Sequence, residues 1–121
     1  VSLHLGSATG LAWESASFDC VVSSLAFHHL KRAEKLKSLE AIRRVLRSGG
    51  EFHLADWGPP HGPLMRLAFL GVRLVDGIAV TRDHVAGNIP TLMKAAGFRG
   101  VRVISSQRTP LGSMYVYRGV A

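Results

Sequence analysis

The chain has 121 residues, of which 47% are hydrophobic and 19% are charged. This length and composition fit one globular domain at most and exclude an extended disordered protein. The net charge is +7, but the basic residues are spread along the chain without a polybasic block. A solvated basic surface is therefore favoured over a nucleic-acid site, for which a basic cluster with interleaved aromatic residues would be expected.

Two features of the sequence bear on the compartment. The single cysteine, Cys20, cannot form an intramolecular disulfide and fits a reducing cytoplasm. The longest apolar stretch, Leu64 to Val80, is interrupted by Arg66, Arg73 and Asp76, so it is a poor candidate for a membrane span. We therefore expect a cytoplasmic protein.

The first half of the chain predicts two strands and a helix. Val1 to Leu5 is a short strand candidate, followed by a glycine-containing loop. Cys20 to Ser23 is an apolar run that predicts a strand buried on both faces, with Cys20 in the core. From Arg32 to Arg47 apolar residues recur three and four positions apart, which predicts one amphipathic helix. Gly49 is expected to end this helix in a left-handed conformation.

A strand and two helical segments are predicted in the middle of the chain. Glu51 to Asp56 predicts the strand, and a loop rich in proline and glycine follows it. Pro63 suits the first turn of a helix from Leu64 to about Asp76. Thr81 suits the N-cap of a short helical segment from Arg82 to Ala86.

The last part of the chain predicts a helix and a hairpin. Pro90 indicates the start of the helix, and Gly97 indicates its end. Val101 to Ser106 and Ser113 to Tyr117 predict two strands. Because the residues from Thr109 to Gly112 favour a turn, we expect these strands to form an antiparallel pair.

The stretch from Phe18 to Asp56 therefore predicts strand, exposed loop, helix and strand, which is one right-handed crossover of a parallel sheet. Ligands of open α/β sheets bind at the carboxyl ends of the strands. The polar and aromatic residues that the sequence places at these ends are Ser23, Ser24, His28, His29, Asp56 and Trp57.

The order of these pieces resembles that of class I S-adenosylmethionine-dependent methyltransferases, and most closely the branch that contains the ubiquinone and menaquinone biosynthesis methyltransferases. The resemblance runs from Val1 to Tyr117 and rests on FDCVVSSLAFHHL, a helix ending in RVLRSGG, the strand EFHLAD, the AAGF stop and the last two strands. It implies an α/β fold with a partial Rossmann-like methyltransferase sheet, mainly parallel with an antiparallel last strand, and helices on both faces.

The glycine-rich GxGxG loop with which this family begins is missing, because the segment from Gly6 to Gly10 lacks that spacing. By the family's order the chain starts at the third strand, so residues 1–121 are expected to form a partial methyltransferase domain without its amino-terminal half. The first family strand would pair with the strand at Cys20 to Ser23. Without it, that strand would expose its apolar faces and an unpaired edge, which favours a marginally stable, dimer-prone or repacked chain.

The resemblance implies S-adenosylmethionine as the cofactor. A turn that begins at Gly6 would lie against the adenine ring, and the strand end at Ser23 would approach the methionine part through backbone atoms. Ser7 stands where the family has an aspartate. The alternative for these positions is an ordinary loop and an ordinary strand end. The residues implied to contact the cofactor are Gly6, Ser7, Ala8, Leu11, Ser23, Ser24 and Leu25.

On the acceptor side, His29 and Asp56 are candidate catalytic residues, and His28 and Trp57 are candidate substrate-binding residues. An imidazole titrates near neutral pH and could remove a proton from a hydroxyl or an acidic carbon of the acceptor. The other interpretation is that the histidine pair shapes the loop and caps the next helix, while Asp56 orients the substrate. The remaining histidines are dispersed along the chain, which predicts no metal site.

We therefore expect an enzyme that transfers a methyl group from S-adenosylmethionine to a small-molecule acceptor, as part of a longer protein. The segment from Leu64 to Val80 is expected to cover the substrate pocket or, alternatively, to make a weak interfacial contact with a membrane. The alternative function is a non-catalytic, methyltransferase-like interaction module that pairs its exposed sheet edge with another chain or forms a homo-oligomer. A basic nucleic-acid binder is the third and less favoured interpretation.

Overall fold

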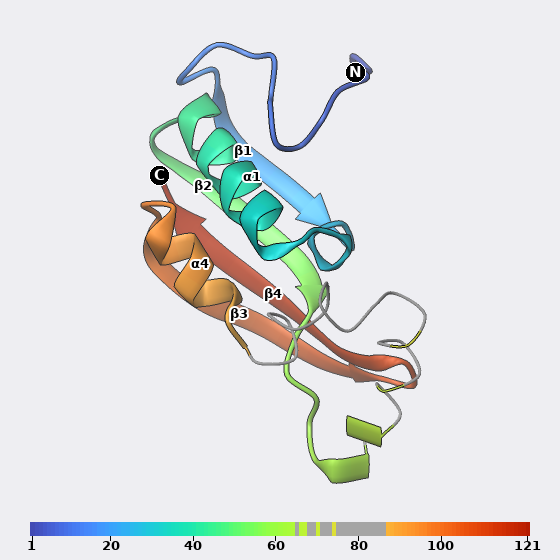
Figure 1. Cartoon of the computed structure of the whole chain (residues 1–121). Helices are drawn as coiled ribbons and strands as arrows, with labels where there is room; N and C mark the ends of the chain where they lie inside the picture. Colours follow the sequence, from blue (N-terminus) through green and yellow to red (C-terminus); the bar gives the residue numbers. More distant parts are fainter. Residues whose placement is uncertain (65, 68–69, 71–73, 75–86) are drawn as a thin grey trace.

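A four-stranded sheet forms the centre of the computed structural model, which describes residues 1–64, 66, 67, 70, 74 and 87–121. Its strands are β1 (Phe18–Ser24), β2 (Leu46–Trp57), β3 (Arg99–Thr109) and β4 (Gly112–Val120), in the order β1-β2-β4-β3 (Figure 1). β1 is parallel to β2, whereas β4 is antiparallel to both β2 and β3. Three strands thus point the same way and the last one opposes them, which confirms the predicted sheet.

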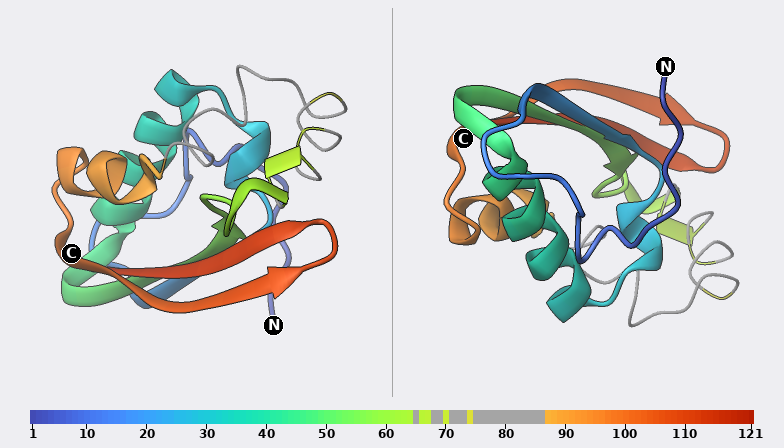
Figure 2. Two further views of the ribbon diagram at one scale, coloured as in Figure 1. Left: turned by 90° about the horizontal axis from the view of Figure 1, so that it is seen from below. Right: turned by 90° about the horizontal axis from the view of Figure 1, so that it is seen from above.

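Helices α1 (Arg32–Val45) and α4 (Ile89–Ala95) both lie on one face of this sheet (Figure 2). The expectation of helices on both faces is therefore wrong for the part of the chain that the structure describes. The reason is topological. The crossover from β1 to β2 and the crossover from β2 to β3 move across the sheet in the same direction, and right-handed crossovers of one direction share a face.

Burial along β2 follows this one-sided arrangement. Phe52, Leu54 and Asp56 are fully buried on the helix face, whereas the alternate residues Glu51 and His53 are only half-buried on the other face. The core beneath the helices brings together residues from both helices, from β2 and β4, and from the segments next to them: Phe27, Leu39, Ile42, Leu46, Phe52, Leu54, Ile89, Leu92, Met93, Ala96, Phe98, Tyr117 and Ala121.

Helix α1 confirms the predicted amphipathic helix, with Leu39, Ile42 and Val45 buried on its inner face. At its start the carboxylate of Glu34 accepts the backbone N–H of Lys31 at 2.8 Å, which satisfies one of the free donors of the first turn. Its end differs from the prediction, because Leu46 is already extended and begins β2.

The predicted role of Gly49 as the helix stop is therefore wrong. Gly49 does have a left-handed φ of 81°, but it lies inside β2, where the pairing with β1 shifts register. Its N–H donates to the carbonyl oxygen of Ala121 at 3.0 Å. The left-handed conformation serves the irregular start of the strand and not the end of the helix.

The carboxy-terminal elements confirm their predictions. Pro90 lies in the first turn of α4, and Gly97 follows the helix with a φ of 95°, a conformation that glycine adopts without steric cost. β3 and β4 form the expected antiparallel hairpin, with Pro110 and Leu111 in the turn.

Two expectations about the amino-terminal part are wrong. Val1 to Leu5 forms no strand, and its apolar side chains, including Leu3, are almost fully exposed. No strand lies beside this segment among the described residues, so its backbone has nothing to pair with. Cys20 is exposed and not in the core, because it pairs with Glu51 of β2 on the sheet face that α1 and α4 leave open.

The exposed edge of β1 agrees with the expectation that this strand would lack a neighbour. Val22 of β1 is 71% exposed, because it pairs with His53 on the sheet face that α1 and α4 leave open. β1 is therefore not buried on both faces. An edge of this kind presents free backbone N–H and C=O groups to any further strand.

The segment after β2 is described only in part. Leu64, Arg66, Leu67, Leu70 and Leu74 are helical and exposed, in agreement with the helix predicted there. The remainder of that helix, the predicted N-cap Thr81 and the segment from Arg82 to Ala86 lie outside the described residues. Within the described part, no helix is both long enough and apolar enough to span a membrane.

A charged cluster lies on the sheet face that α1 and α4 leave open. The carboxylate of Glu51 accepts hydrogen bonds from the guanidinium of Arg118 and from Nε2 of His53, the latter at 2.8 Å. The bond from Arg118, followed by that from His53, lowers the pKa of Glu51 from 4.5 to about 2. The ionised form of Glu51 is therefore stabilised in the folded chain.

This pKa predicts a defined pH dependence of stability. Because the folded pKa of Glu51 lies below the ordinary value, the hydrogen bonds to its ionised carboxylate contribute fully above pH 4.5 and are lost as the pH falls toward about 2. The difference in unfolding free energy between the native chain and Glu51→Gln should shrink over that range, measured by urea unfolding at low salt. Glu40→Gln, an exposed carboxylate of α1, is the matched control. A difference that stays constant down to pH 2 would contradict the cluster.

Candidate functional site at the carboxyl end of strand β2

Asp56 is a fully buried carboxylate at the carboxyl end of β2. Its Oδ2 accepts the backbone N–H groups of Phe27 at 2.9 Å and His28 at 3.2 Å. Its Oδ1 accepts the N–H of Trp57 at 2.8 Å and lies 2.7 Å from Nδ1 of His28. An ionised carboxylate only accepts hydrogen bonds, so Nδ1 of His28 carries the hydrogen in this pair.

The local chain path explains why this carboxylate meets these donors. β1 and β2 are parallel neighbours, so their carboxyl ends lie at the same edge of the sheet. The short helix η1 (Phe27–His29) follows β1, and its first N–H groups have no partner within the helix. Leu25 before it has a left-handed φ of 51° and donates its N–H to the carbonyl of Ala55 at 2.9 Å. Asp56 thereby caps a tightly constrained turn.

The two histidines of η1 have different surroundings. His28 is 5% exposed and is held by Asp56, whereas His29 is exposed. Their rings are in contact, tilted by 42° with centroids 3.9 Å apart. Asp56 therefore orients His28, and His28 supports His29 at the surface of the sheet edge.

Trp57 is not part of this group. Successive side chains of a strand point to opposite faces, so Trp57 lies on the face opposite Asp56. It is half-buried there and pairs in register with Met114 of β4. The structure thus brings Asp56, His28 and His29 together and places Trp57 on the opposite face of the sheet.

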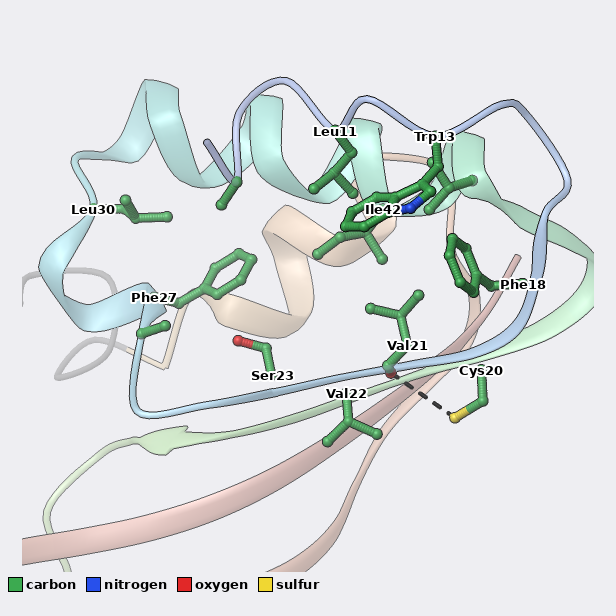
Figure 3. A pocket seen from close by; sticks show the side chains of 13 residues that line it. Leu11, Trp13, Phe18, Cys20, Val21, Val22, Ser23, Phe27, Leu30 and Ile42 are labelled. Carbon is green, nitrogen blue, oxygen red and sulfur yellow. Dashed lines mark hydrogen bonds between the residues drawn. The ribbon is translucent and has the colours of Figure 1, made fainter. Parts of the chain in front are cut away.

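One pocket adjoins β1, and a second lies in the amino-terminal loop before it. The larger, of about 400 Å³, is almost wholly apolar and lies between β1, α1 and the amino-terminal loop (Figure 3). Ala8, Leu11 and Ser23 line it together with aromatic side chains such as Trp13 and Phe27. The smaller, of about 320 Å³, lies within the loop itself. Its lining includes four predicted cofactor residues: Gly6, Ser7, Ala8 and Leu11.

The remaining predicted cofactor residues, Ser24 and Leu25, line neither pocket. Ser24 is exposed at the end of β1, and Leu25 is 43% exposed in its left-handed turn. The hydroxyl of Ser7 is engaged locally, because it lies 2.8 Å from the hydroxyl of Thr9 and accepts the Thr9 N–H at 3.3 Å. The predicted cofactor residues thus form two groups, one in the loop and one at the end of β1. Ala8 and Leu11 of the first group and Ser23 of the second line the same apolar pocket.

A second polar cluster, which the sequence did not indicate, fixes the loop after β2 to β4. Ser113 is fully buried, and its Oγ lies 2.6 Å from Nδ1 of His61 and accepts the His61 N–H at 3.1 Å. The hydroxyl of Tyr115 donates to the carbonyl of Pro59 at 3.0 Å, and its ring stacks on His61. The pairing register of β4 with β2 brings these residues together. The local sequence does not indicate that register.

Tyr117 lies in the core beneath these groups. Its hydroxyl is buried and has no hydrogen-bond partner among the residues that the structure describes. Burial, followed by the proximity of Tyr115 and Asp56, raises the pKa of Tyr117 well above its usual value. Tyr117 therefore stays neutral and acts as a packing residue. In the same described set, no group of three or more His, Cys, Asp or Glu side chains could hold a metal ion.

Comparisons with known proteins bear on this architecture. A family model described as a methyltransferase domain matches residues 1–54. No curated protein matches the sequence. Similar solved structures include S-adenosylmethionine-dependent methyltransferases from Thermotoga maritima (20% identity, TM-score 0.67) and Aquifex aeolicus (17%, 0.61). Phosphoethanolamine N-methyltransferase 2 of Haemonchus contortus, solved with phosphomonomethylethanolamine and S-adenosylhomocysteine, is also similar (16%, 0.66).

These structures align with nearly the whole chain but only with part of their own length. The alignments cover 95%, 99% and 93% of this chain, and 61%, 55% and 36% of the Thermotoga, Aquifex and Haemonchus proteins. The chain therefore has the α/β fold of the methyltransferases over the shared part. It spans less than two thirds of the length of each of these three proteins.

The buried position of Asp56 predicts a large effect of its substitution on stability. Asp56→Asn keeps the size of the side chain but turns an NH₂ group toward backbone N–H donors, so we expect a loss of about 3 kcal/mol of unfolding free energy. Asp19→Asn on β1 is the matched control, because Asp19 is 81% exposed in its pair with Arg47 and should cost less than about 1 kcal/mol. Equal losses for the two variants in urea unfolding would refute the anchoring role.

Proposed function

We propose that this chain is the carboxy-terminal part of an S-adenosylmethionine-dependent methyltransferase that acts on a small organic acceptor, within a longer protein. One observation carries the proposal: 95% of the chain aligns with a structure of a methyltransferase, in an arrangement that brings candidate residues to the carboxyl edge of the sheet. The match of residues 1–54 to a methyltransferase-domain model supports it.

The residues present fit one end of the cofactor. The loop pocket of about 320 Å³ offers Gly6, Ala8 and Leu11, which suit a flat adenine ring packed between backbone and an aliphatic side chain. When bound, S-adenosylmethionine supplies an already activated methyl group, so the protein's main task is to align the acceptor with it. Ser23, Ser24 and Leu25 would approach the methionine part. The glycine-rich loop for that part would come from outside residues 1–121.

On the acceptor side we assign His29 as the candidate base, because it is exposed at the sheet edge and an imidazole titrates near neutral pH. The prediction of Asp56 as a catalytic residue is revised. Both of its oxygens are occupied by the η1 turn and it has no exposed surface, so it acts as a positioning residue. His28 shares that role through its ring contact with His29. Trp57 would contact an acceptor only from the opposite face.

The family branch, the compartment and the class of acceptor belong to the same proposal. The histidine pair after FDCVVSSLAF supports the branch that contains the ubiquinone and menaquinone methyltransferases. The exposed thiol of Cys20 supports a reducing cytoplasm. The acceptor is a small molecule in this proposal, and no nucleic acid is required.

A second function is favoured by one observation, the free edge of β1. β1 is the outermost strand of the described sheet, and Leu25 just after it is 43% exposed. A chain with such an edge can serve as an interaction module by pairing with a strand of another chain, including a second copy of itself.

The two functions predict different results in solution. In isothermal titration calorimetry, residues 1–121 alone should bind S-adenosylhomocysteine with a dissociation constant weaker than about 1 mM, because the methionine part of the ligand has no cradle. The protein read from the complete coding sequence should bind it at micromolar concentration and methylate a small acceptor. Micromolar binding by residues 1–121 would contradict the division of the site. A complete protein that dimerises in sedimentation equilibrium without binding the cofactor would support the interaction module instead.

A further inference from the structure

The loop that carries the predicted adenine contact is fastened to the end of helix α1. The guanidinium of Arg44 donates from Nη2 to the carbonyl oxygen of Leu11 at 2.7 Å and from Nη1 to that of Trp13 at 2.8 Å. Nη1 also lies 3.5 Å from the hydroxyl of Ser15. One side chain thus holds three positions of a loop that has almost no regular secondary structure.

Backbone contacts continue this attachment up to β1. The N–H of Ala16 donates to the carbonyl of Arg44 at 3.0 Å, and the N–H of Ser17 donates to that of Val45 at 2.8 Å. Ala16 has a left-handed φ of 55°, a conformation that costs a non-glycine residue energy and persists only when its surroundings enforce it. Arg47 adds a bond from Nε to the carbonyl of Ala16 at 3.2 Å.

The same helix also forms part of the pocket over which the loop passes. Ile42 and Val45 line the apolar pocket from α1, and Leu11 and Trp13 line it from the loop. Figure 3 shows Leu11 and Trp13 reaching from the loop toward Ile42. Because Arg44 binds the carbonyls of Leu11 and Trp13, it fixes the separation between these two walls.

We infer that Arg44 is a positioning residue. By binding the carbonyls of both Leu11 and Trp13, it holds the loop wall of the apolar pocket at a fixed distance from α1. An arginine is suited to this task because its planar guanidinium presents several N–H donors at fixed angles and keeps its charge at any physiological pH. A lysine offers a single ammonium, which does not span two carbonyls in the same way. The part of this inference that concerns cofactor affinity rests on the proposed function.

Amide hydrogen exchange in residues 1–121 tests the attachment directly. Arg44→Ala should speed the exchange of the Ala16 and Ser17 amides by about tenfold or more, because the loop loses its charge-assisted bonds. The amides of Leu92 in α4 and of Ala96 at its end should be unchanged, which separates a local effect from general unfolding. Arg44→Lys should resemble Arg44→Ala. Unchanged exchange at Ala16 and Ser17 in Arg44→Ala would overturn the inference.

Arg43→Ala is the matched control on the same helix. Arg43 is also exposed, but its Nε donates to the carbonyl of Gly97 at 2.9 Å, so it holds the end of α4 instead. Its loss should speed the exchange of the Gly97 and Phe98 amides and leave Ala16 and Ser17 unchanged. If Arg43→Ala loosened the loop as much as Arg44→Ala does, the specific role of Arg44 would be refuted.

Measuring ligand binding by the complete protein tests whether the loop position set by Arg44 affects cofactor affinity. Arg44→Ala should weaken S-adenosylhomocysteine binding by about tenfold, whereas Arg43→Ala should leave it unchanged. Equal affinity of the native protein and Arg44→Ala would refute a role in cofactor binding while leaving the proposed function intact. If the native protein did not bind the ligand, the proposed function would fail, and the exchange experiment would still decide whether Arg44 positions the loop.

Discussion

The candidate site depends on one interaction, the hydrogen bonding of the buried Asp56 carboxylate to the turn that follows β1. The carboxylate satisfies backbone donors of η1 that would otherwise be buried without partners, and it fixes the ring of His28. These hydrogen bonds together offset the cost of burying the charge. The loss of any one of them would therefore destabilise the whole turn. His29, whose ring contacts that of His28, therefore lies at a defined place at the sheet edge.

Much of the fold could be predicted because its elements carry local signals. Helix α1 shows the spacing of three and four between apolar residues, and the hairpin of β3 and β4 has turn residues between its strands. The sheet directions follow from the alternation of strand and helix. The end of α1 could not be predicted from Gly49, since the strand pairing of Leu46 with Phe18 overrides the local preference for a glycine stop.

The candidate site was less predictable because its contacts join distant parts of the chain. The sequence placed Asp56 at the correct edge, but the positions of its oxygens depend on the parallel pairing of β1 and β2. Trp57 was assigned to the same site, whereas strand alternation places it on the opposite face. The role of Arg44 could not be predicted from its local sequence, because its partners Leu11 and Trp13 lie more than thirty positions earlier.

The central claim is that Asp56 holds the η1 turn through hydrogen bonds to its carboxylate. Scalar couplings across hydrogen bonds, measured by NMR on the isotope-labelled chain, detect such bonds directly. The account predicts couplings from the amide nitrogens of Phe27 and His28 to the carboxyl carbon of Asp56, alongside the backbone couplings between β2 and β4. Detection of the backbone couplings without those to Asp56 would contradict it.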